Sequence, residues 1–188
     1  MKYPAESYSK DECKAILDAC GKSWTGLRNQ ALIVLLWRSG LRLAEALAVR
    51  HTDIDWSAQS IRVLHGKGDK ARTVGIDEAG LATIKTYLNK TTRVFGPKDT
   101  LIITHAGKPL QQSYVRAMLP RIAKKAGVNK RVHAHGFRHT FAVELTRERV
   151  PVSHIQRLLG HTSLATTSIY LSSLSPEEAL DHVRGRVW

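Results

Sequence analysis

The amino-acid sequence predicts a mainly α-helical protein with one small antiparallel β-hairpin, an α+β fold. Helical apolar spacing and capping signals recur along most of the chain, and the apolar run 31–37 marks a helix that is buried on most sides. Only residues 60–76 alternate between apolar and polar side chains, as strands do. A chain of 188 residues is long enough for one well-buried core, so we expect a single domain over residues 1–188.

The first helices each have a recognisable start or stop. Ser9 and Glu12 form a capping box, which predicts a helix from there to about residue 20. A second helix over 27–39 ends at Gly40, because glycine readily adopts the left-handed conformation of a helix stop. The helical pattern restarts at once over 41–47, so a third helix begins directly beside this turn.

Arg42 and Glu45 lie at the start of this third helix. They are three residues apart, which lets their side chains face each other on one side of the helix. The alternative without any function is a surface ion pair, worth ~0–1 kcal/mol.

Residues 60–65 and 71–76 predict two strands, and the glycine-rich turn 66–70 joins them as a hairpin. Lys67 would lie at the tip of this hairpin. A lysine in a turn is usually only a solubilising charge, so Lys67 taken alone indicates no function.

The middle of the chain returns to helical patterns. Asp77 caps a helix that runs to about residue 88, and a loop over 89–99 and a short strand over 100–104 follow it. A basic helix is expected over 111–126, with a kink or a division into two helices at Pro120, because proline removes a hydrogen bond from a helix interior.

The last third of the chain predicts several short helices. Gly136 favours a helix that starts after it and runs to about residue 149, and Pro151 separates this helix from the next one, over 153–159. Gly160 ends that helix. The remaining expectations are a helix from Thr162 or Ser163 to about residue 169, Tyr170 at its end, and a tail helix from Ser175 to about residue 183.

The composition is strongly basic, with a formal net charge of +13. Residues 108–149 hold ten basic side chains against two acidic ones. Because such a field concentrates polyanions, nucleic acid is the expected partner.

The longest apolar run is 31–37 and no secretory leader is visible, so we expect a cytoplasmic protein with no membrane partner. Cys13 and Cys20 would lie about 10 Å apart along one helix, too far for a disulfide.

Three histidines raise the question of a metal site. His135 and His139 would share one helical face if the helix included both, and His133 lies close by. No acidic or thiol ligand is near them in the sequence, so we expect no metal site.

Five short motifs follow one another with the order and spacing of a known family. Each motif is weak alone, and Tyr170 by itself is more often a packing residue than a nucleophile. Together they resemble, over about residues 9–171, the catalytic domain of the tyrosine recombinases, the phage integrase family. The motifs are residues 40–45, 66–68, 135–142 and 159–161, and Tyr170.

The resemblance implies a tyrosine recombinase catalytic-domain fold and a site that transfers a phosphodiester. Arg42 and Arg138 would bind the scissile phosphate, and Glu45 would orient Arg42. Tyr170 would be the nucleophile that forms a covalent 3′-phosphotyrosine, and His161 would donate a hydrogen bond to the phosphate.

The resemblance also implies how protons move. Lys67 would be the general acid and His135 would assist proton transfer, although Lys70 is near enough in the sequence to be the acid instead. Planar guanidinium groups match the non-bridging oxygens of a phosphate in pairs. Because the phosphotyrosine conserves the bond energy, we expect no metal, no ATP and no other cofactor.

The expected partner is double-stranded DNA. In the family the C-terminal helix packs on a neighbouring subunit, so the tail over 172–188 would support a dimer or tetramer on DNA. Residues 1–8 would be a lead-in, and we do not expect the family's separate N-terminal core-binding domain in this chain. The candidate DNA contacts are Lys70, Arg72, Arg116, Arg121, Lys124, Lys125, Lys130, Arg131 and His139.

The sequence therefore predicts site-specific DNA recombination, in which strands are cleaved and rejoined through Tyr170. One alternative is relaxation of supercoiled DNA, as by a type IB topoisomerase, with similar chemistry but no exchange of partners. A second alternative is a DNA-binding module that has lost catalysis.

Overall fold

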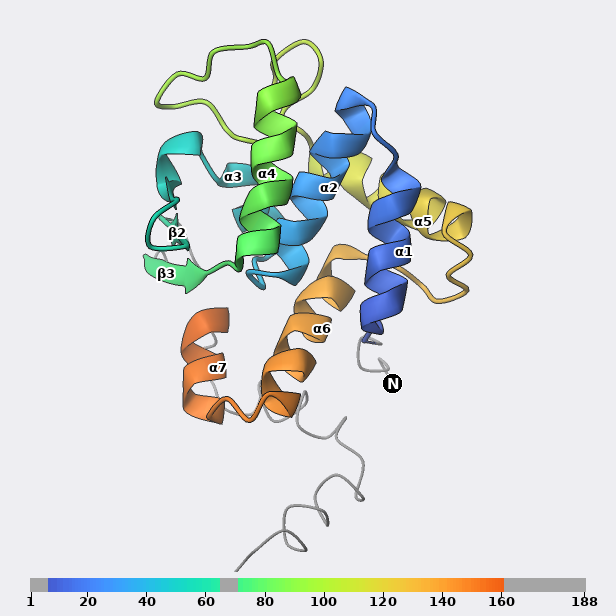
Figure 1. Ribbon diagram of the computed structural model, residues 1–188, viewed down its shortest axis with the longest axis vertical. Helices are drawn as coiled ribbons and strands as arrows, with labels where there is room; N and C mark the ends of the chain where they lie inside the picture. Colours follow the sequence, from blue (N-terminus) through green and yellow to red (C-terminus); the bar gives the residue numbers. More distant parts are fainter. Residues whose placement is uncertain (1–6, 65–70, 161–188) are drawn as a thin grey trace, which may run out of the picture.

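The computed structural model describes residues 7–64 and 71–160 and has the expected α+β architecture (Figure 1). Helix α2 (Trp24–Trp37) is central: it packs against α1 (Lys10–Cys20), α4 (Glu78–Lys90) and α6 (Ala134–Arg147). The remaining elements are α3 (Leu43–Ala48), the short 3-10 helix η1 (His51–Asp53), β1 (Ile54–Asp55), β2 (Ser60–Val63), β3 (Arg72–Gly75), α5 (Gln112–Lys125) and α7 (Val152–Leu159).

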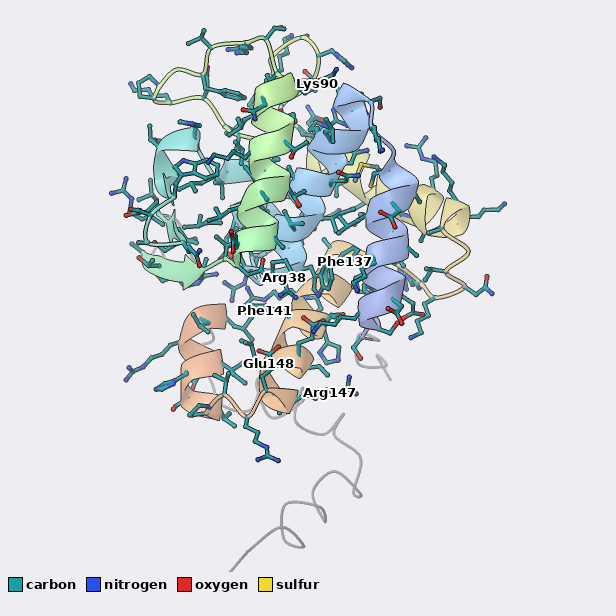
Figure 2. All side chains as sticks on the ribbon, in the orientation of Figure 1. Arg38, Lys90, Phe137, Phe141, Arg147 and Glu148 are labelled. Atoms are coloured by element: carbon teal, nitrogen blue, oxygen red, sulfur yellow. The ribbon has the colours of Figure 1, made fainter. Side chains whose placement is uncertain are left out.

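The core forms around α2 because this helix is apolar on nearly every side. Ser23 caps its start by accepting a hydrogen bond from the Gly26 N–H, and eleven of its fourteen residues are buried. At its end, Arg38 makes ion pairs with Asp77 and Glu144 and so joins α2 to the start of α4 and to α6 (Figure 2). The prediction of a helix that is buried on most sides is confirmed.

The capping signals in the sequence were also accurate. Ser9 and Glu12 form the expected capping box at the start of α1, and Asp77 accepts from the Gly80 N–H at the start of α4. Cys13 and Cys20 are both free thiols.

The three strands form one antiparallel sheet in the order β1-β2-β3. The predicted hairpin pairs Ser60 with Gly75 and Val63 with Arg72, so both strands are shorter than expected. The two-residue strand β1 was not predicted. The prediction of a strand over 100–104 was wrong, since Thr100 and Ile103 make only isolated bridges, to Arg50 and Pro109.

Two helices bear on the expectations made at a proline and a glycine. Helix α5 continues through Pro120 as one helix and is not divided there. Helix α6 begins at Ala134, so the prediction of a start after Gly136 was wrong. His133 caps this first turn, because its Nδ1 accepts from the Gly136 N–H at 3.1 Å. A Cβ at residue 136 would lie 1.9 Å from Oη of Tyr8, so glycine is required by packing.

Helices α6 and α7 form a smaller unit beneath α2 and α4 in Figure 1. Phe141 lies between them (Figure 2) and shares an apolar cluster with Ile155 and Leu159. Over residues 7–64 and 71–160, no helix is long and apolar enough to cross a membrane.

Candidate active site

A cavity of about 570 Å³ opens between the start of α3, one face of α5 and the first turn of α6. None of its lining residues within 7–64 and 71–160 is a carboxylate, so the basic side chains around it make the cavity attractive to an anion. The charged or titratable residues that line it are Arg42, Arg116, Arg131, His133, His135 and Arg138.

Arg42 reaches the cavity from the N-terminal end of α3. Its backbone N–H donates to Oε2 of Glu45 at 2.8 Å, and its Nη1 donates to Oε1 at 2.8 Å. Glu45 is only 6% exposed, so the pair is not the solvent-exposed ion pair that the sequence left open. The structure therefore fixes both the backbone and the guanidinium of Arg42 through one carboxylate.

The same carboxylate binds two more arginines. Arg72 donates to Oε1 and Oε2 of Glu45 at 2.9 and 2.8 Å, and Nη1 of Arg138 lies 3.9 Å from Oε2. Burial alone would raise the pKa of Glu45, but the hydrogen bonds from Arg72 and Arg42 outweigh it and lower the pKa to about 2. Glu45 is therefore an anion throughout the physiological range, held by three cations.

The three arginines also bind three consecutive carbonyls at the end of α7. Arg72 Nε donates to Leu158 O at 3.0 Å, and Arg42 Nη2 donates to Gly160 O at 3.0 Å. Nη2 of Arg138 donates to the carbonyl of the residue between them, Leu159. The last carbonyls of a helix have no partner within it, and cations near them are favourable. This arginine cluster thus fixes the chain immediately before His161.

Arg138 is 1% exposed, although it borders the cavity. Its Nη1 donates to Gly40 O at 2.6 Å, in the turn between α2 and α3. Gly40 has a φ of +61°, and a Cβ there would lie 2.4 Å from Phe141, so this turn can approach α6 only with glycine.

His135 lies in the first turn of α6 and is half-buried. Burial lowers the pKa of its imidazole, and the positive charges of Arg138, His133 and Arg42 lower it further. The ring is therefore neutral at physiological pH, which is the form that can accept a proton.

Two candidate DNA contacts lie inside the protein. His139 is 3% exposed, and burial lowers its pKa to about 4, so its ring is buried in the neutral form. The side chain of Arg72 is 12% exposed, and all three of its nitrogens donate to protein atoms. Both side chains are therefore enclosed by the protein in this structure, and their contact with DNA stays a prediction.

The other described candidates are distributed along α5 and the loop that follows it. Arg116 and Arg131 line the cavity. Lys130 makes an ion pair with Glu12, and Lys125 donates to Ala19 O. The remaining pair, Arg121 and Lys124, are exposed on α5. Lys67, Lys70, His161, Tyr170 and the tail over 172–188 lie outside the described residues.

Sequence reasoning missed Tyr8 and the structural role of Arg72. The hydroxyl of Tyr8 accepts from the His133 N–H at 3.0 Å and lies within hydrogen-bonding distance of two carbonyls, those of Arg131 and His133. An apolar residue just before a helix cap is a known packing position, which could have drawn attention to Tyr8. Arg72 shares the buried face of its strand with Val74, and an arginine there indicates an internal ion pair.

The sequence model of the phage integrase family matches residues 6–176. The chain belongs to the phage integrase family. This range includes every element that lines the cavity, and it confirms the family that the five sequence motifs indicated.

Curated tyrosine recombinases match this chain over much of its length. Tyrosine recombinase XerC of Listeria welshimeri is 35% identical over 148 residues, which are 77% of this chain and 49% of that protein. A tyrosine recombinase of Thermosipho africanus is 33% identical over 177 residues, which are 94% of this chain and 60% of that protein. The chain spans about half the length of the curated relatives it matches.

Solved structures of recombinases and of an integrase share the fold. The crystal structure of XerA recombinase has a TM-score of 0.84 at 29% identity, covering 100% of this chain and 66% of that one. XerH site-specific recombinase bound to its palindromic difH substrate, in a post-cleavage complex, has a TM-score of 0.79 at 27% identity, covering 96% and 52%. The catalytic domain of bacteriophage HP1 integrase has a TM-score of 0.67, covering 97% and 96%. The predicted tyrosine recombinase catalytic-domain fold is confirmed.

Proposed function

We propose that this chain is the catalytic domain of a site-specific recombinase, which cleaves and rejoins strands of double-stranded DNA through a covalent 3′-phosphotyrosine. The observation that carries the proposal is the cavity that Arg42, Arg138 and His135 line together, with no carboxylate among its described lining residues. The family membership and the XerH complex with its difH substrate support it.

The arginines of the cavity supply the charge that the reaction needs. A phosphodiester carries one negative charge, and in-line attack adds charge to its non-bridging oxygens. Arg42 and Arg138 bind these oxygens, and Glu45 orients Arg42. To bind the phosphate, each guanidinium uses N–H groups beyond those that bind the protein, or it releases a backbone carbonyl and binds the phosphate in its place.

The remaining residues take part in the bond changes of strand cleavage. Oη of Tyr170 attacks the phosphorus, the bond to the 5′ oxygen breaks, and the DNA 3′ phosphate stays on the tyrosine. The proton of Tyr170 passes to neutral His135, while Lys67, or Lys70 in its place, protonates the departing 5′ oxygen. His161 donates a hydrogen bond to the phosphate. Attack by a 5′ hydroxyl reverses these steps and rejoins the strand without ATP.

Basic side chains attract the DNA to the cavity, and several copies of the chain assemble on DNA to exchange its strands. Arg116 and Arg131 contact the duplex beside the scissile phosphate, and Arg121, Lys124, Lys125 and Lys130 contribute attraction farther along α5 and the loop after it. The tail over 172–188 packs on a neighbouring copy, so exchange takes place in a dimer or tetramer on DNA.

The test is a trap for the covalent intermediate. The chain is incubated with a pool of nicked suicide duplexes of randomised sequence, whose short cleaved piece diffuses away and prevents rejoining. We expect an adduct that resists denaturants, with mass mapping to Tyr170, and none from Tyr170→Phe. Absence of any adduct from the wild-type chain would overturn the proposal. Relaxation of plasmids without a recognition site and without recombinant products would favour the topoisomerase alternative.

A further inference from the structure

Arg72 is bound within the protein, beside the arginines that line the cavity. It is the first residue of β3, and its guanidinium grips both oxygens of Glu45 in a bidentate pair at 2.9 and 2.8 Å. Its third nitrogen, Nε, donates to Leu158 O at 3.0 Å. Bidentate arginine–carboxylate pairs are strong and fix geometry, so this one residue ties α3, β3 and α7 together.

Arg72 also neutralises part of the negative charge of Glu45, which Arg42 and Arg138 share with it. Within the described residues the cluster contains one carboxylate and three guanidiniums, those of Arg42, Arg72 and Arg138, so its net charge is +2. Without Arg72, Glu45 would be shared by Arg42 and Arg138 alone, and the net charge would fall to +1. The carboxylate would then draw both guanidiniums toward itself.

We propose that Arg72 is a positioning residue, which holds Glu45 and the end of α7 so that Arg42 and Arg138 stay directed at the phosphate. This inference rests on the strand-transfer function proposed above. It concerns the rate of the chemical step, because the two arginines bind most tightly where negative charge develops in the transition state.

A direct contact between Arg72 and a DNA phosphate would have the opposite signature. Each phosphate contact contributes about one to the slope of log affinity against log salt concentration. A positioning residue leaves that slope unchanged and lowers the cleavage rate when DNA is saturating. The two roles therefore separate in one set of measurements.

The experiment uses the suicide duplex that gives the wild-type adduct, and an unnicked copy of it for binding. Single-turnover cleavage is measured at saturating duplex, and affinity is measured by fluorescence anisotropy over a series of salt concentrations. For Arg72→Ala we expect a rate about 10 to 100 times lower, as when groups that orient functional residues are lost, with affinity and salt slope unchanged. Arg72→Lys should also be slow, because an ammonium cannot bind both carboxylate oxygens in a planar pair.

Arg62 provides the matched control, since it lies on the neighbouring strand β2 with a side chain that is 61% exposed. Arg62→Ala should cleave at the wild-type rate. If Arg72→Ala fails to fold, Arg72→Lys, which keeps the charge, supplies the same readouts. A lower salt slope with an unchanged saturating rate would overturn the proposal for either variant.

A double-mutant cycle tests whether Arg72 acts through Glu45. If it does, Glu45→Gln should remove most of the further loss caused by Arg72→Ala, whereas additive losses would contradict the mechanism. A wild-type adduct together with a wild-type rate for Arg72→Ala would overturn the positioning role alone. The lack of any wild-type adduct would overturn the strand-transfer proposal, and the role of Arg72 with it.

Discussion

Arg42 donates a hydrogen bond of 3.0 Å to the carbonyl of Gly160, although 118 residues separate the two in the sequence. The contact joins the start of α3 to the end of α7. Because Arg42 also binds Glu45, a change at either end of this connection reaches the cavity between α3, α5 and α6. A substitution at such a contact should therefore change both the stability of the fold and the geometry of the site.

Glu45 should make the fold sensitive to acid. Its pKa falls from 4.5 to about 2 on folding, so its ion pairs stabilise the protein above pH ~4.5 and are lost as the pH falls toward 2. A shift of this size corresponds to about 3 kcal/mol. The free energy of unfolding in urea, measured from pH 7 to pH 3, should fall more steeply for the wild type than for Glu45→Gln. The exposed Asp11→Asn variant is the control, and identical slopes for Glu45→Gln and the wild type would contradict the assignment.

Tyr8→Phe should disturb the first turn of α6. Removing the hydroxyl leaves the His133 N–H without this acceptor, which costs about 1–3 kcal/mol of stability, and should lower the cleavage rate because His135 lies in the same turn. Tyr87→Phe is the matched control, since it loses a hydrogen bond to Leu101 O in the core. Urea unfolding and single-turnover cleavage should show both variants destabilised and only Tyr8→Phe slowed. Equal rates for the two variants would disprove the link.

Gly136→Ala should destabilise the protein even though alanine favours helices. Its Cβ would lie 1.9 Å from Oη of Tyr8, and overpacking of this kind costs about 1–3 kcal/mol, more than the ~1 kcal/mol of helix propensity gained. In a Tyr8→Ala background the cost should largely disappear. Thermal unfolding of the four combinations measures this coupling, and strictly additive changes would show that the clash is absent.

The identity of the general acid can be decided by the leaving group. Replacing the bridging 5′ oxygen of the duplex by sulfur makes a leaving group that needs no protonation. Lys67→Ala should cleave the ordinary duplex about 10²–10⁴ times more slowly and recover with the sulfur-bridged one, while Lys70→Ala should change little. The reverse pattern would identify Lys70 as the acid.

Cleavage should proceed without a divalent metal. In the proposed function the charge of the arginine cluster replaces that of a metal ion at the phosphate, so adduct formation in excess chelator should match that in buffer with added Mg²⁺. A strict requirement for metal would direct attention to the histidines at the start of α6.

Much of the fold could be read from local signals. The capping box at Ser9, the cap at Asp77 and the left-handed glycine at Gly160 depend on residues within a few positions, so the sequence identifies them directly. The family motifs likewise placed Arg42, Glu45 and Arg138 in one site, and in the structure both arginines lie against the Glu45 carboxylate.

What could not be read depends on contacts between distant segments. Gly136 disfavours a helix by propensity, yet packing against Tyr8 requires it, and no local pattern reveals a partner 128 residues away. Charge alone suggested that Arg72 and His139 contact DNA. Only the fold shows that both are turned inward, because a basic residue on a strand or helix looks the same in sequence whether its partner is a phosphate or a buried group.

The carbonyl contacts at the end of α7 determine when the site can exist during synthesis. Arg42, Arg72 and Arg138 emerge from the ribosome before Leu158, Leu159 and Gly160, which anchor them. A nascent chain that stops short of α7 therefore carries all three guanidiniums without the acceptors that hold them in place. The cluster is complete only after the last described helix has been made and has docked, so an unfinished polypeptide lacks the assembled arginine cluster.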